Sequence, residues 1–113
     1  MKIPNNNRSY VADNKITDYL LSYIHEVGKH KAEFFKRFGF DIADIDTFRG
    51  SLIQHSIDRD IEKIQHTDFG TKYELKCEIR TPDKRNPCVM TVWIVENGKD
   101  RPTLVTAYPA DRQ

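Results

Sequence analysis

The chain has little cysteine and no long apolar run. Its 113 residues include two cysteines, Cys77 and Cys88, too few for a disulfide framework, and they form no C-x-x-C pair. We interpret both as small apolar residues of the interior, which favours a reducing compartment. No segment approaches the roughly 20 apolar residues that span a bilayer, and residues 1–7 lack the apolar core of a signal peptide. The sequence therefore predicts a cytoplasmic protein without a membrane segment.

An excess of charge of one sign is also missing. Eighteen Lys and Arg stand against seventeen Asp and Glu, a formal net charge of +1. So small a net charge gives no strong overall attraction to nucleic acid or acidic membranes, although a local basic patch is compatible with it. The length predicts a single domain over residues 1–113, large enough to bury its own hydrophobic core.

Motifs of several common enzyme classes are absent from the sequence. It contains no nucleophile elbow, no P-loop and no dinucleotide-binding glycine pattern. None of the four histidines has the spacing of a metal ligand; His25 and His30, for example, are five positions apart and do not share a helical face. The sequence therefore predicts neither a metal site nor a cofactor.

Hydrophobic periodicity predicts helices in the first half of the chain. Apolar residues, including Tyr19, Tyr23 and Ile24, recur at helical spacing after a capping residue at Asp13 or Asn14. This first helix is expected to end near residues 27–28, where glycine suits a left-handed cap. A second helix is predicted over 29–37, and a third begins at about residue 44.

The period changes to two near residue 60, which predicts strands. A short strand is expected over 61–65, and apolar and charged residues then alternate over 72–80, as in a half-buried antiparallel strand. Residues 88–95 are apolar on both faces except at Thr91, which indicates a central strand, and a last strand is predicted over 103–108. Short connections between strands favour a meander. The predicted class is α+β, with two or three N-terminal helices packed on a C-terminal antiparallel four-stranded meander sheet.

The main candidate site is a basic cluster at the start of the second helix, formed by Lys29, His30 and Lys31. Backbone N–H groups are unpaired at a helix start, and the helix dipole favours an anion there. Two lysines and a histidine at this place suit a phosphate. Because basic residues oppose the dipole, a solvated basic turn is the alternative interpretation.

The last two strands supply further polar and aromatic candidates. If these strands pair, Thr91 and Thr106 lie near one region of the sheet, with Trp93 and Tyr108 two residues further along. A hydroxyl group and aromatic rings beside a basic helix suit a nucleobase and its phosphate. The alternative is that Trp93 and Tyr108 are aromatic residues of the core.

Four segments resemble a small bacterial family catalogued as a domain of unknown function. They are residues 1–4 (MKIP), 28–35 (GKHKAEFF), 91–95 (TVWIV) and 102–108 (PTLVTAY). Members of that family occur as free small proteins and as C-terminal modules of polymorphic toxins and phage head-morphogenesis proteins. This context implies a distant relation to the barnase, EndoU, colicin D and RelE group of metal-independent ribonucleases, although fold alone does not fix activity.

The resemblance implies roles for the candidate residues in RNA cleavage. His30 would act as a general base or acid, while Lys29 and Lys31 would stabilise charge on the phosphate. Thr106 or Thr91 would bind the phosphate through a hydrogen bond, and Tyr108 or Trp93 would stack on a base. Some members of the family carry an acidic residue at the position of His30, which makes the lysines and the strand residues the better candidates for a shared site.

Two functional hypotheses follow from the sequence. The first is a metal-independent, RNA-cleaving, nuclease-like domain of bacterial toxin type, with RNA as substrate and a cognate antitoxin or immunity protein as partner. The second is a non-catalytic interaction module, such as an antitoxin, an immunity protein or an accessory protein. The near-zero net charge favours the second hypothesis, because free ribonuclease toxins are usually basic.

Overall fold

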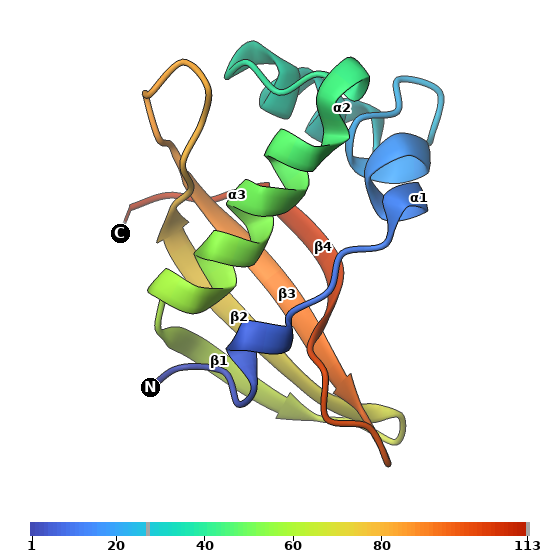
Figure 1. Ribbon diagram of the computed structural model, residues 1–113, viewed down its shortest axis with the longest axis vertical. Coiled ribbons are helices and arrows are strands. Elements are labelled where there is room, and N and C mark those ends of the chain that lie inside the picture. Colours follow the sequence, from blue (N-terminus) through green and yellow to red (C-terminus); the bar gives the residue numbers. More distant parts are fainter. Residues whose placement is uncertain (27, 113) are drawn as a thin grey trace.

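The computed structural model describes residues 1–26 and 28–112, with the helices before the sheet (Figure 1). The helical elements are η1 (Asn6–Arg8), α1 (Asp13–Lys15), η2 (Ile16–Leu20), α2 (Lys29–Arg37), η3 (Ile42–Asp44) and α3 (Ile45–Asp58). The strands are β1 (Ile61–His66), β2 (Gly70–Glu78), β3 (Cys88–Glu96) and β4 (Thr103–Pro109). They form one four-stranded antiparallel sheet in the order β1-β2-β3-β4. The predicted α+β class and the meander are confirmed.

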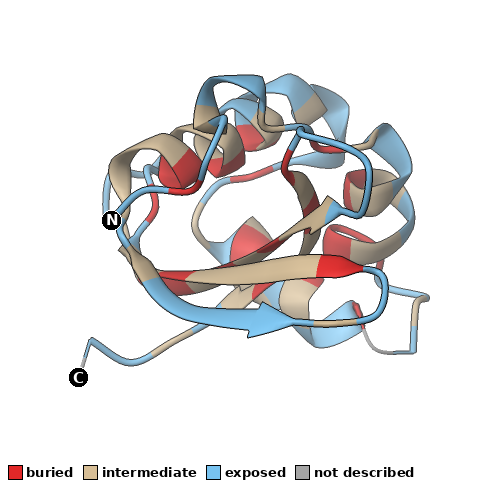
Figure 2. Cartoon of the chain, turned by 90° about the horizontal axis from the view of Figure 1, so that it is seen from below, coloured by how far each residue is buried: buried red, intermediate tan, exposed pale blue. Residues whose placement is uncertain are grey.

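The helices cover one face of the sheet and bury the core between the two layers (Figure 2). An aromatic cluster joins α2 to α3: the ring centroids of Phe35 and Phe48 are 4.8 Å apart, and those of Phe40 and Phe48 are 4.3 Å apart. All three rings are at most 2% exposed. The helix α3 is capped as predicted, because the Asp44 side chain accepts a hydrogen bond from the backbone N–H of Thr47.

The first helix is much shorter than predicted. After α1 the chain makes the π-helical turn η2, in which the N–H of Leu21 donates to the carbonyl of Ile16, five residues earlier, at 2.8 Å. The predicted end at residues 27–28 falls partly on Val27, which lies outside the described residues. Tyr23 and Ile24 are 54% and 95% exposed, so they do not extend the apolar stripe that the prediction used.

The segment before α1 is attached to the edge of the sheet. The N–H of Tyr10 donates to the carbonyl of Pro102 at 2.8 Å, and the N–H of Leu104 donates to the carbonyl of Tyr10 at 3.0 Å. These bonds pair Tyr10 with Thr103 in a parallel bridge. Because the bridge covers part of the β4 edge, it holds the following elements, α1 and η2, beside that strand.

A buried chain of hydrogen bonds connects α3 to the middle of the sheet. The indole Nε1–H of Trp93 donates to Thr91 Oγ1 at 2.9 Å. Thr91 Oγ1 is in turn 2.9 Å from His55 Nδ1, and His55 Nε2 is 2.9 Å from the carbonyl oxygen of Cys77. An indole only donates and a carbonyl only accepts. The consistent arrangement therefore has Thr91 donating to Nδ1, with the imidazole hydrogen on Nε2 donating to Cys77.

The last of these hydrogen bonds coincides with an irregularity in β2. The φ of Cys77 is 119°, a conformation that is uncommon for a residue with a side chain. Cys77 is only partly buried, whereas Cys88 is 5% exposed. The prediction of two interior cysteines is therefore confirmed for Cys88 and wrong for Cys77, because the backbone of Cys77 turns its carbonyl toward His55.

Burial lowers the pKa of His55 to about 4, from an ordinary value of 6.5. As the pH falls below 6.5, the unfolded chain takes up a proton at this residue before the folded chain does. The contribution of His55 to the free energy of unfolding is thus complete above 6.5 and is lost as the pH falls to about 4, a loss on the order of 3 kcal/mol. We predict this loss in urea unfolding curves measured across that interval.

The test variant is His55→Gln, which should flatten the pH dependence; His66→Gln, on the exposed strand β1, serves as the control. An unaltered slope in the His55→Gln protein would contradict the assignment.

Candidate functional site

A cleft of about 490 Å³ opens between the first helical elements and β4. It is lined by residues from α1, η2, the following loop and β4, namely Asn14, Lys15, Asp18, Tyr19, His25, Val105 and Thr106. A long-range contact places these groups together, because the bridge between Tyr10 and Thr103 holds η2 beside β4. Turns of the π-helical kind are frequent at functional sites.

The phenol of Tyr19 is the centre of this cleft. Lys31 Nζ donates to Tyr19 Oη at 2.6 Å, and Thr106 Oγ1 lies 3.1 Å from the same oxygen. The ammonium groups of Lys31 and Lys15 lie 4.8 Å and 5.4 Å from the centroid of the Tyr19 ring. The phenol oxygen thus has one ammonium group and one hydroxyl group as neighbours, and a second ammonium group lies over the ring.

These neighbours change the acidity of Tyr19. Partial burial alone would raise its pKa, but the hydrogen bonds from Lys31 and Thr106, with the positive charges of Lys31 and Lys15, outweigh that effect. The pKa of Tyr19 is therefore lowered from its ordinary value of 10.0. A phenol with a lowered pKa reaches its anionic form more easily and is a better group for proton transfer near neutral pH.

The imidazole of His25 supports the phenol from the side. Its ring packs edge-to-face on the ring of Tyr19, with centroids 4.8 Å apart. The N–H of Gly28 donates to His25 Nδ1 at 3.0 Å, so a neutral His25 carries its hydrogen on Nε2. The start of α2 thus fixes the ring that holds Tyr19 in place.

Gly28 is required here by a close approach of the backbone. A Cβ atom at this position would lie 2.2 Å from the carbonyl oxygen of Tyr19 and 3.0 Å from an atom of its ring. The φ of Gly28 is −77°, so the prediction of a left-handed cap was wrong. Glycine is needed because α2 begins against η2, and that contact brings Lys31 to Tyr19.

The structure unites only some of the predicted catalytic residues. Lys31 and Thr106 converge on Tyr19, from α2 and β4 respectively. Lys29 and His30 are exposed and line a separate depression of about 180 Å³. This depression is completed by Tyr23 and Glu33, so the basic cluster is divided between two surfaces of the helix start.

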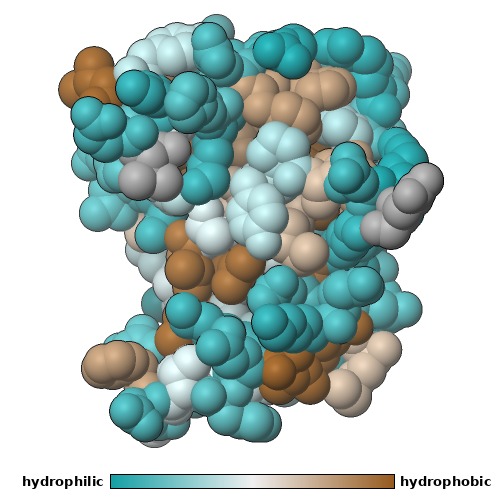
Figure 3. Space-filling view, turned by 180° about the vertical axis from the view of Figure 1, so that it is seen from behind, coloured by the Kyte–Doolittle hydropathy of each residue, from teal (hydrophilic) through white to brown (hydrophobic). Residues whose placement is uncertain are grey.

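The predicted substrate-binding residues lie on opposite faces of the sheet. Thr91 and Trp93 are 0% exposed and face the helices; Trp93 is thus the core aromatic of the alternative interpretation. Thr91 pairs with Ala107, and neighbouring side chains of a strand point to opposite faces. Thr106 and Tyr108 therefore belong to the face opposite α3 (Figure 3), and at the β4 edge Tyr19 of η2 meets Thr106 there. Burial and then the charge of Glu74 raise the pKa of Tyr108.

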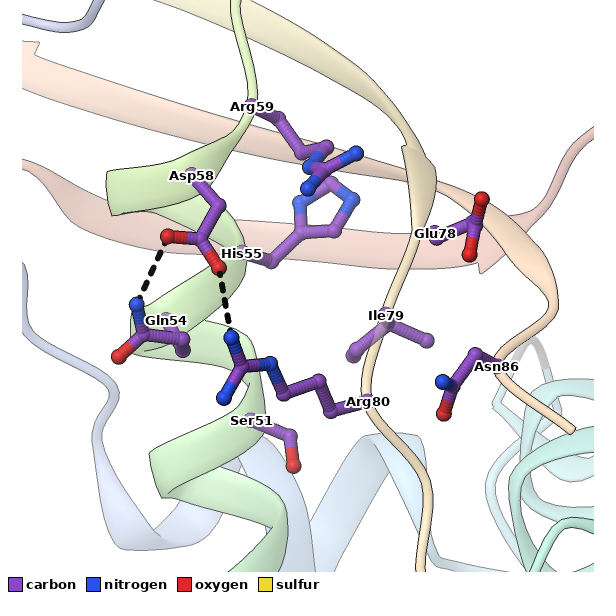
Figure 4. Close-up of a pocket in the computed structure, with 9 residues that line it drawn as sticks. All are labelled: Ser51, Gln54, His55, Asp58, Arg59, Glu78, Ile79, Arg80 and Asn86. Carbon is purple, nitrogen blue, oxygen red and sulfur yellow. Dashed lines mark hydrogen bonds and ion pairs between the residues drawn. The ribbon is translucent and has the colours of Figure 1, made fainter. Parts of the chain in front are cut away.

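A second cavity, of about 110 Å³, lies between α3 and β2 (Figure 4). Its carboxylates have partners: Asp58 accepts from Gln54 at 2.8 Å and is 3.8 Å from Arg80. Glu78 is 3.4 Å from Arg112. Because His55 behind it belongs to the buried hydrogen-bond chain, this cavity offers no group prepared for proton transfer. Among the described residues, no cluster of three or more His, Cys, Asp or Glu is placed to hold a metal ion.

Tyr19, His25 and Lys15 line the cleft but were not predicted as site residues. Lys15 and Tyr19 are four positions apart, so a helix places them on one face, and this spacing was the available signal. Tyr19 was assigned to the apolar stripe instead. No local pattern predicts that α2 begins against the carbonyl of Tyr19.

The fold is shared with a protein of known structure. A chain of the contact-dependent growth inhibition toxin–immunity protein complex from Klebsiella pneumoniae 342 superposes with a TM-score of 0.73. The two sequences are 19% identical, over 94% of this chain and 97% of that chain. At this identity the likeness shows a common fold.

The family is shown by sequence. The chain belongs to the family described as a domain of unknown function, DUF6883, whose model matches residues 2–111. The predicted membership in a family of this kind is confirmed. No curated protein matches the chain. Among the described residues, no helix is long and apolar enough to cross a membrane.

The acidity of Tyr19 is the first prediction from this site. We expect one tyrosine to titrate below the others in an ultraviolet absorbance titration, and this component to be absent from Tyr19→Phe. Lys31→Met should raise the pKa of Tyr19, because it removes both the hydrogen bond and the charge. Lys29→Met serves as control, since Lys29 pairs with Glu26 at 3.9 Å; an equal effect of both substitutions would contradict the assignment.

The second prediction concerns Gly28. Gly28→Ala should displace η2 from α2 and destabilise the protein by about 1–3 kcal/mol, as overpacking does, and the low-pKa tyrosine should be lost. The matched control is Gly50→Ala in α3, where nothing lies within 4 Å of the added Cβ. That substitution should stabilise the helix by about 0.5–1 kcal/mol. Chemical unfolding measures both changes, and a neutral Gly28→Ala would refute the close approach.

Proposed function

We propose that this protein is a metal-independent, RNA-cleaving domain of bacterial toxin type, with its active site in the Tyr19 cleft. The observation that carries the proposal is the phenol of Tyr19, which receives a 2.6 Å hydrogen bond from Lys31, lies 3.1 Å from Thr106 and has a lowered pKa. These groups lie in a cleft of about 490 Å³, large enough for a phosphodiester with its ribose.

The arrangement can perform cleavage by the ribose 2′-hydroxyl. Tyr19, as phenolate, accepts the proton of that hydroxyl, and the 2′-oxygen attacks phosphorus. The bond to the 5′-oxygen breaks, leaving a 2′,3′-cyclic phosphate and a 5′-hydroxyl that takes its proton from a lysine ammonium group. Lys31 and Lys15 offset the charge that develops on the phosphate. Once Tyr19 has taken up the proton, its hydroxyl can donate to Thr106, and the Thr106 hydroxyl hydrogen is then available to the phosphate. His25 positions the Tyr19 ring.

The other predicted residues have secondary roles in this proposal. Lys29 and His30 lie outside the cleft, where they can contact the phosphate of a neighbouring nucleotide. His30 remains the candidate for a second proton-transfer group if RNA bends toward the depression that it lines. Tyr108 is kept as a base-stacking residue because it is partly exposed. Thr91 and Trp93 are left out because both are 0% exposed.

The comparisons support the toxin context of the proposal. The structural relative is a chain of a growth inhibition toxin–immunity protein complex, and the predicted relation to the barnase, EndoU, colicin D and RelE group independently favours a toxin domain. From this likeness we infer a protein partner for the present chain, an immunity protein or antitoxin. Such a partner would block the cleft and protect the host.

A non-catalytic interaction module is the second candidate. Ile24 and Phe69 are 95% and 78% exposed, and exposed apolar side chains of this size are common in contacts between proteins. The formal net charge of +1 also fits a protein-binding role better than a role on RNA. In this reading the partner would cover the loop that carries Ile24.

RNA cleavage in the presence of EDTA tests the proposal. Purified protein should convert total or transfer RNA to fragments with 2′,3′-cyclic phosphate ends. Tyr19→Phe and Lys31→Met should each lower the rate at least about a hundredfold, as loss of a proton-transfer group does. Gel analysis of end-labelled RNA measures the rate, and circular dichroism verifies the fold of each variant.

His30→Ala is the informative comparison. A small effect of this substitution, beside a large effect of Tyr19→Phe, places catalysis in the cleft; the reverse result would move it to the start of α2. If RNA stays intact at high concentrations of folded wild-type protein, the proposal of an enzyme is rejected and the interaction module is the remaining candidate.

A further inference from the structure

The face of the sheet without helices carries two rows of side chains that lead out of the Tyr19 cleft. The strand register aligns Glu74 with Val92, and Val92 with Thr106. In an antiparallel sheet, residues aligned in this way point to the same face.

The second row lies on the same face and has a different composition. The register aligns Lys76 with Met90, and Met90 with Tyr108. All three side chains are partly exposed. Tyr108 is two residues beyond Thr106 on β4, so the rows are adjacent, and the effect of Glu74 on the Tyr108 hydroxyl shows that the two rows interact. An aromatic ring, a thioether and a cation therefore stand beside the cleft.

Side chains of weak polarity occupy the middle of this face, with separate apolar patches beside and below them and hydrophilic side chains around (Figure 3). A tyrosine, two apolar side chains and a lysine, here Tyr108, Met90, Val92 and Lys76, are a composition that binds the bases and backbone of a single strand. A base pair would hide the faces of the bases from such a floor, so paired RNA does not fit. A protein partner would find here a narrow apolar strip interrupted by the charges of Glu74 and Lys76.

We propose that this open face binds single-stranded RNA, with the base next to the scissile phosphate stacked on Tyr108. The inference deepens the proposed function, since it names the substrate of the same cleft. Thr106 contacts the phosphate. Tyr108, two residues further along β4, stacks on the base. Met90 and Val92 form the floor under the following base, and Lys76 meets its phosphate.

Glu74 is the residue that selects the base in this arrangement. Glu74 lies across β3 from Thr106, at the other end of the first row, and its charge acts on the Tyr108 hydroxyl. Its carboxylate only accepts hydrogen bonds. Carboxylates accept from exocyclic amino groups, as on cytosine, whereas uracil has a carbonyl oxygen at that place. The stacked base is therefore one with an amino group, and uracil binds more weakly.

Binding to a non-cleavable strand tests the inference without requiring catalysis. The probes are short 2′-deoxy oligonucleotides of cytosine or thymine, the second lacking the amino group, and the duplex form of a mixed sequence. Fluorescence anisotropy should show binding to the cytosine strand that exceeds binding to thymine and to duplex. Tyr108→Ala should weaken it about tenfold, as loss of one stacked base does, while Tyr108→Phe retains it.

Glu74→Gln and Lys76→Met separate recognition from charge. Glu74→Gln should reduce the preference for cytosine, and Lys76→Met should weaken binding to both strands and reduce the salt dependence. Glu62→Gln on the outer strand β1 is the matched control and should change neither. In cleavage assays with RNA, Tyr108→Ala should raise KM and leave kcat within about twofold, because stacking serves binding.

The outcomes distinguish this inference from the proposed function. If single strands bind in a way that depends on Tyr108 but RNA is not cleaved, the inference about the binding face is supported and the proposal of an enzyme is rejected. Cleavage with an unchanged KM in Tyr108→Ala would retain the enzyme and overturn the inference. Equal binding of duplex and single strand would overturn it as well.

Discussion

The hydrogen-bond chain from Trp93 through Thr91 and His55 to the carbonyl of Cys77 is the interaction on which the arrangement of helices and sheet depends. It joins β3, α3 and β2 at a place where the side chains are at most 2% exposed. Polar groups buried so deeply are costly unless each has a partner, so the chain permits only one position of α3 over the sheet. With α3 fixed, the aromatic cluster around Phe48 determines where α2 lies.

The position of α2 then creates the cleft. The residue before this helix packs so closely on the carbonyl of Tyr19 that only glycine fits at position 28, and one turn later Lys31 reaches the phenol. From the other side, the bridge between Tyr10 and Thr103 brings η2 to β4, so that Thr106 meets the same oxygen. The acidity of Tyr19 is thus a consequence of two independent contacts between segments far apart in the chain.

The near-zero net charge and a site for a polyanion are compatible because the charges are not evenly distributed. The cations that matter for the proposed activity lie around the side chain of Tyr19, where partial burial makes each of them more effective than on an open surface. A surface of mixed charge elsewhere reduces non-specific attraction to nucleic acid. Specific contacts in the cleft, and on the open sheet face that continues it, would then carry recognition of RNA.

The sequence by itself determined the class of fold, the strand order and the bounds of α2, because these depend on local periodicity and short connections. It also singled out Lys31 and Thr106 as candidates, and the structure brings both to the phenol of Tyr19. It did not decide whether Thr91 and Trp93 belong to the core. Alternation along β3 places these two side chains on one face of the sheet and Val92 on the other, but only the packing of α3 decides which face is buried. The π-helical turn, the partnership of Tyr19 with Lys31 and Thr106, and the reason for Gly28 all arise from contacts between distant segments. Such contacts depend on the tertiary structure, since no pattern within one segment records which atoms another segment will bring against it.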